Sequence, residues 1–250
     1  MSRRLLSSAG AFVAAGVAVA TLLAAPAGAR PVPPVRSTNA TTPSSNGCPP
    51  AFADLRSRGH AEAARRETTL TTLSSALTGA QDPWGVNSGL LSTLANAKSN
   101  LVALDQRIQS SCYPTREGLR ADVATIFAGY RVYWLRVPQS RIVEEADHLG
   151  VARGKLASVA QTLTGLVGGN AQAQADLTAM DHALASFDST LGTVPNLTSH
   201  VAAVPGLVPA QDMSGNVAAM QAARADLKTA RQALGQAATD AKKVVADLKH

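Results

Sequence analysis

Two cysteines, Cys48 and Cys112, have the most specific chemistry in the sequence. Both follow an export-type N-terminus, and disulfides form in oxidising compartments outside the cytosol. Cys48 precedes one expected helix and Cys112 follows the next, so an antiparallel hairpin of these helices brings both sulfurs to the same end. We therefore predict a Cys48–Cys112 disulfide that closes a loop of about 65 residues and stabilises the fold by roughly 4 kcal/mol.

Glu145 and His148 have the E-x-x-H spacing that places a carboxylate and an imidazole on one helix face, as in carboxylate-bridged metal pairs. Such a site needs a second motif of this kind, and no other histidine has a glutamate three positions earlier. The neighbouring residues Asp181 and His182 point about 100° apart on a helix, so they form no catalytic relay. We expect no metal, no cofactor and no enzyme activity. A metal-dependent enzyme is a remote alternative.

Phe127, Tyr130, Tyr133 and Trp134 lie within eight positions, shortly before Pro138. Because they cover adjoining faces of one expected helix, we predict that this half-helix is buried between two others as a junction core. The alternative is a small apolar pocket opened by a kink at Pro138, which would hold a lipid or another apolar ligand.

Three arginines near this cluster, Arg131, Arg136 and Arg141, are followed directly by acidic residues. We interpret these charges as a solvated face on which Glu144, Glu145 and Asp147 compensate the arginines.

The N-terminus has the three parts of a signal peptide, assigned to residues 1–29. Arg3 and Arg4 precede an uncharged apolar stretch, and Ala27-Gly28-Ala29 supplies the small-x-small cleavage pattern. We expect cleavage between Ala29 and Arg30. The arginine pair also suits twin-arginine export, so both export routes stay open.

Residues 30–47 are rich in Pro, Ser, Thr and Asn without an apolar period, which predicts a disordered tether. The net charge of +6 falls to +4 without Arg3 and Arg4, which gives no indication of nucleic-acid binding. The sequence contains no second apolar run of spanning length. We expect a secreted protein, released or loosely associated with the cell surface, with no integral membrane association after signal removal.

From residue 50 onward, apolar residues repeat at intervals of three and four, the spacing of packed helices. An alanine-rich composition with 4% aromatic residues also favours helix over β-sandwich. Helices are expected at 51–78, 88–110, 116–137, 138–167, 171–192 and 214–249, with a crossover loop at 193–213.

These lengths predict an all-α fold, an elongated antiparallel bundle. The simplest packing has two three-helix bundles, at 48–137 and 138–250, sharing a long central helix. Because the apolar period runs up to Val137 and resumes at Ile142, we expect that helix to be nearly continuous but kinked at Pro138. A single broader bundle is the alternative.

The segments YRVYWLRVPQSRIVEEADHLG (130–150) and NVAAMQAARADLKTARQALGQAATDAK (216–242) resemble a group of exported, coiled-coil-like helical-bundle proteins of high-GC Gram-positive bacteria. The resemblance implies a secreted bundle over nearly the whole mature chain and no catalytic residues.

These features predict a non-enzymatic helical spacer or interaction module at or outside the cell surface. Its partner would be a protein or another cell-envelope component, and its helical seams also allow a homo-oligomer. The alternative function is a carrier of a lipid or other small apolar ligand near residues 127–134.

Overall fold

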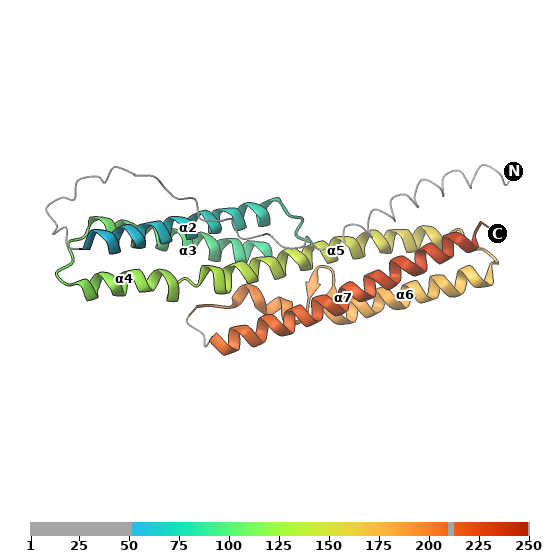
Figure 1. Ribbon diagram of the computed structural model, residues 1–250. Coiled ribbons are helices and arrows are strands. Elements are labelled where there is room, and N and C mark those ends of the chain that lie inside the picture. Colours follow the sequence, from blue (N-terminus) through green and yellow to red (C-terminus); the bar gives the residue numbers. More distant parts are fainter. Residues whose placement is uncertain (1–51, 210–212, 250) are drawn as a thin grey trace.

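The computed structural model describes residues 52–209 and 213–249, and in these ranges the chain is almost entirely helical (Figure 1). The signal peptide, the Ala29–Arg30 cleavage point, the tether at 30–47 and Cys48 lie outside the described residues. The predicted all-α class is confirmed.

The α-helices of the described ranges are α2 (Ala53–Gly79), α3 (Asn87–Ser110), α4 (Arg116–Ala128), α5 (Val137–Thr164), α6 (Ala171–Leu191) and α7 (Met213–Asp247). A π-helical turn, η2 (Val132–Arg136), connects α4 to α5. Between α6 and α7 come the short strands β1 (Gly192–Thr193) and β2 (Asn196–Leu197) and the 3-10 helix η3 (His200–Gly206). The strands pair antiparallel, with Gly192 opposite Leu197.

The molecule is elongated, with α2, α3 and α4 side by side in one half and α5, α6 and α7 in the other (Figure 1). Helix α5 begins beside α2 and then runs along α6 and α7. Its 28 residues span about 42 Å. One long helix therefore links the two halves.

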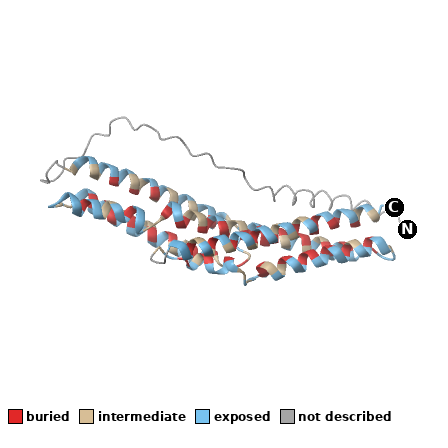
Figure 2. Cartoon of the chain, turned by 60° about the horizontal axis from the view of Figure 1, so that its bottom comes forward, coloured by how far each residue is buried: buried red, intermediate tan, exposed pale blue. Residues whose placement is uncertain are grey.

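Leucines at three-four spacing form the core of both halves. In α3 the buried stripe contains Leu90, Leu94, Leu101, Leu104 and Ile108, and in α6 it contains Leu177, Met180, Leu184, Phe187 and Leu191. The buried positions follow one side of each helix (Figure 2). The apolar seams predicted for these two helices are confirmed.

The interruption between α4 and α5 lies earlier than Pro138, where the sequence predicted a kink. Helix α4 ends at Ala128, and Arg131 adopts a left-handed conformation with φ of 44°. Pro138 lies in the first turn of α5, which follows η2 directly, and Arg136 and Val137 before it both have right-handed helical dihedral angles. The N–H of Val137 donates to the carbonyl of Val132, which is the π-helical pattern. The predicted helix at 116–137 is thus interrupted at residues 129–131, whereas the chain is helical through Pro138. The kink at Pro138 stays a prediction.

The joint between the halves is filled by Trp84 and by η3. Trp84 is 4% exposed, and its indole Nε1–H donates to the backbone oxygen of Ala146 over 2.9 Å. An ideal Cβ built on Gly150 would lie 2.8 Å from that same Nε1, so only glycine leaves room for the ring. The 3-10 helix η3 packs on α3, α5 and α7 and buries Val201 and Val204.

Candidate functional site

The aromatic residues around position 130 lie mainly on the surface. Phe127 is 47% exposed, Tyr133 45% and Trp134 47%, while Tyr130 is half-buried. The predicted junction core is therefore wrong. The left-handed residue Arg131 breaks the helical phase, so the buried positions of this stretch are instead Ile126, Val132 and Leu135.

Arg66 of α2 holds two of these rings in place. Its guanidinium carbon lies 4.4 Å from the centre of the Phe127 ring and 5.0 Å from that of Tyr133, within the range of cation–π attraction. Arg66 is only 6% exposed, because the rings cover it. We call Phe127, Tyr133 and Arg66, together with the exposed Trp134 that follows Tyr133 in the chain, the aromatic patch.

Polar contacts with α2 also hold the patch residues in place. The Arg66 guanidinium forms an ion pair with Glu62 and also donates to the Glu62 backbone oxygen over 3.1 Å. The hydroxyl groups of Thr69 and Tyr133 are 3.3 Å apart. The patch is thus tied to α2, a helix distant in sequence from the rings.

The break after α4 places the rings on this surface. Phe127 belongs to the last turn of α4, whereas Tyr133 and Trp134 belong to η2. The N–H groups of Trp134 and Leu135 both donate to the carbonyl of Arg131, over 3.1 and 2.7 Å. These bonds fix η2 directly after the left-handed residue.

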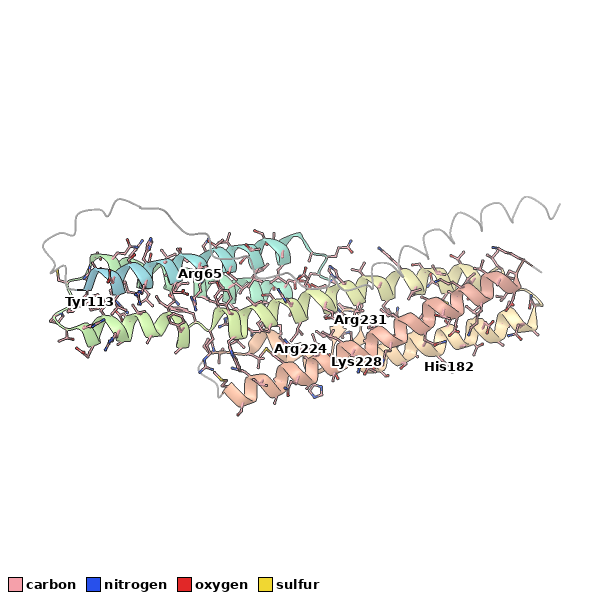
Figure 3. All side chains as sticks on the ribbon, viewed as in Figure 1. Arg65, Tyr113, His182, Arg224, Lys228 and Arg231 are labelled. Atoms are coloured by element: carbon pink, nitrogen blue, oxygen red, sulfur yellow. The ribbon has the colours of Figure 1, made fainter. Side chains whose placement is uncertain are left out.

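A hollow of about 380 Å³ adjoins Phe127 between α2 and α4. Its apolar lining includes Leu55, Ala61 and Val123, and its charged lining consists of Arg58, Glu62 and Arg65. Arg65 lies on the exposed side of α2 and pairs with Glu62 at 2.6 Å (Figure 3). The surface beside the patch thus combines apolar and charged side chains.

The histidine motifs do not form a site with each other. Glu145 pairs with Arg231 of α7, which joins α5 to α7 (Figure 3). His148 is exposed, and so are Asp181 and His182 of α6. Within the described ranges, no group of three or more His, Cys, Asp or Glu side chains is placed to hold a metal ion.

The interpretation of residues 131–147 as a solvated charged face is wrong for Arg136 and Asp147, which are both buried. Arg136 contacts the end of η3, and Asp147 contacts Asn87 of α3. Burial lowers the pKa of Arg136 and raises the pKa of Asp147 to about 7, because low-dielectric surroundings disfavour the charged forms.

The described part of the hairpin has the arrangement that the disulfide prediction needs. The Arg56 guanidinium, in the first turn of α2, donates to the backbone oxygens of Gln109 and Ser111, both over 2.8 Å. The start of α2 therefore lies beside the end of α3, next to Cys112. Since Cys48 lies outside the described residues, the pairing stays a prediction.

Comparison of the chain with family models, with curated proteins and with solved structures finds no match. The resemblance to exported helical-bundle proteins stays a prediction. No helix in the described ranges is both long enough and apolar enough to cross a membrane.

Proposed function

We propose that the protein is a non-enzymatic interaction module, a helical spacer outside the cell that presents the aromatic patch to a partner protein. The observation that carries this proposal is the exposure of Phe127 and Tyr133 over a buried Arg66, with Trp134 exposed next to Tyr133 in the chain.

The composition of the patch supports a protein partner. Binding energy at protein interfaces is concentrated in Trp, Tyr and Arg, and interface cores are enriched in aromatic residues. The Arg66 contacts order two of the rings before a partner arrives, which lowers the entropy lost on binding. The exposed side chains of Arg58 and Arg65 lie next to the patch and favour a partner surface with carboxylates around an apolar centre.

The shape of the molecule supports the spacer role. The patch belongs to the half formed by α2, α3 and α4, and α5 continues from it into the other half (Figure 1). The signal peptide and tether expected from the sequence would place such a rod outside the cell.

The carrier hypothesis also has a location, the hollow of about 380 Å³ beside Phe127. Three of its seven lining residues, Arg58, Glu62 and Arg65, are charged. This lining suits the edge of a protein contact better than the enclosure of a lipid chain.

Photocrosslinking of the full mature protein tests the proposal. A benzoyl-phenylalanine in place of Phe127 is exposed to the cell envelopes and culture medium of producing cells. The same group in place of Leu166, an exposed apolar residue after α5, is the matched control. We expect a discrete protein adduct from position 127 that is absent from position 166 and reduced by Trp134→Ala.

Three outcomes would contradict the proposal. Equal adducts from both positions would show non-specific contact, and a lipid adduct would favour the carrier. An adduct only with a second copy of the chain would show self-association instead of a separate partner.

A further inference from the structure

Arg136 is a buried cation without an anionic partner among the described residues. The side chain is 5% exposed. Its Nη1 donates to the Gln139 side-chain oxygen over 2.9 Å and to the Leu207 backbone oxygen over 3.1 Å, and both acceptors are neutral. Its Nε–H is enclosed without an acceptor. A buried guanidinium in this state lacks the charge compensation that buried ions normally have.

Two other arginines of the same chain show what this side chain normally binds. Arg107 donates from Nε and Nη2 to the two carboxylate oxygens of Asp122, over 2.8 and 2.7 Å. Arg153 makes the same paired contact with Asp188. In Arg136 neither Nε nor Nη2 has an acceptor among the described residues, and because Nε is enclosed, Nη2 is the group left to reach a ligand. A guanidinium N–H can form a charge-assisted hydrogen bond with an oxygen of a carboxylate or phosphate.

Arg136 borders a hollow of about 280 Å³ between α3 and the connection from α4 to α5. The other polar side chains of its lining are Thr93, Asn96 and Asn100 of α3 and Tyr130, and Pro209 closes one side. Asn96 and Asn100 are four residues apart, so they lie on one face of α3. The described lining therefore contains neutral donors and acceptors and a single positive charge.

We propose that this hollow binds a small molecule through its carboxylate or phosphate group, with Arg136 as the anion partner. Asn96 and Asn100 would contact the polar remainder of the ligand. This site does not share residues with the aromatic patch, so it is a second binding activity that stands independently of the proposed function.

Arg136 also has a structural contact that a test must separate from binding. Together with Gln139, whose Nε2 donates to the Val204 and Leu207 carbonyls, it attaches the end of η3 to α5. A loss of ligand binding in an Arg136 variant could therefore follow from displacement of η3. Variants of the α3 asparagines avoid this problem, because these side chains are exposed and form no hydrogen bond with η3 in the described structure.

The test is calorimetric titration of the full mature protein with inorganic phosphate, acetate and malate at constant ionic strength, with acetamide and glycerol as neutral probes. Separate phosphate and carboxylate titrations distinguish the two ligand chemistries. The variants are Arg136→Met, Asn96→Leu and Asn100→Leu, and Arg120→Met is the control at an exposed arginine.

We expect saturable binding of at least one anion and of neither neutral probe, with affinity unchanged in Arg120→Met. Arg136→Met should weaken binding about tenfold or more, because a charge-assisted hydrogen bond is lost. The asparagine variants, which remove the amide groups of the lining, should also weaken anion binding. No anion binding by the unmodified protein, or unchanged binding in Asn96→Leu and Asn100→Leu, would overturn the proposal even if Arg136→Met fails to fold.

Discussion

Asp147 is a carboxylic acid fully enclosed at the joint between the two halves. Its Oδ2 accepts a hydrogen bond from Asn87 Nδ2 over 2.9 Å, and its Oδ1 has no partner among the described residues. Burial raises the pKa of Asp147 to about 7, and the charges of Asp82 and Glu144 act in the same direction. The neutral acid is therefore the form that the folded protein favours below about pH 7.

This raised pKa predicts that the folded state loses stability as the pH rises from about 4 to about 7. In that interval the folded protein binds a proton at Asp147 that the unfolded chain has released, so the free energy of unfolding decreases with pH. The decrease is at most about 4 kcal/mol over some three units, and it levels off above pH 7. Asp147→Asn should remove it, which urea denaturation at a series of pH values measures.

Glu144→Gln is the control for this prediction, because Glu144 is the neighbouring half-buried acid of α5. It should leave most of the pH dependence in place. The same decline in Asp147→Asn as in the unmodified protein would show that another group causes it.

Among the elements, the apolar stripes of the regular helices were predictable from the sequence, and the irregular connection from α4 to α5 was not. The three-four spacing of leucines suffices to identify α3 and α6, because few secondary structures other than a packed helix give a continuous apolar stripe at this spacing. The break after α4 depends on the left-handed conformation of Arg131, an uncommon state for a residue other than glycine.

The burial of Arg136 and Asp147 could have been found in the sequence. Arg136, Ser140, Val143 and Asp147 follow one another at intervals of four, three and four, and all four are buried. The period places them on one helix face. A search by hydropathy alone misses this buried face, since three of the four side chains are polar. For the aromatic patch no comparable signal exists, because the phase of its rings depends on the break at Arg131.

Replacing Pro138 tests the predicted kink. Pro138→Ala restores an N–H that can donate into the preceding helical turn, so we expect a straighter path from η2 into α5. Small-angle scattering of the monomeric variant should give a larger maximum dimension than the unmodified protein. An unchanged maximum dimension would show that the proline does not bend the chain.

Gly150 and Gly154, one turn apart on α5, should respond oppositely to alanine. Gly150→Ala places a Cβ within 3.0 Å of Pro83 and Trp84 and should lower the free energy of unfolding by about 1–3 kcal/mol. Gly154 has no neighbouring atom within 4 Å of an ideal Cβ, so Gly154→Ala should raise it by about 1 kcal/mol through helix propensity. Urea denaturation followed by circular dichroism compares the two free energies of unfolding, and equal effects would contradict the packing at this joint.

At the scale of the whole molecule, two helical halves are joined by α5. A spacer needs a stiff joint, because only then does it hold its two ends at a fixed separation. Trp84, η3 and the Arg231–Glu145 pair all act across or beside that joint. The exposed aromatic patch lies away from it, on α2, α4 and η2. Partner binding and the rigidity of the rod therefore depend on separate residues. Substitutions in the aromatic patch should leave the joint intact, and substitutions at the joint should leave partner binding intact.

The chain's two tryptophans provide the most direct test of partner binding through the aromatic patch. Trp134 lies in the patch and Trp84 is buried at the joint. Fluorine NMR of the protein labelled with 5-fluorotryptophan gives one signal for each, and the partner recovered by crosslinking is titrated in. The account predicts a change in the chemical shift of Trp134 with none at Trp84, abolished by Phe127→Ala. An unchanged Trp134 shift at saturating partner would contradict it.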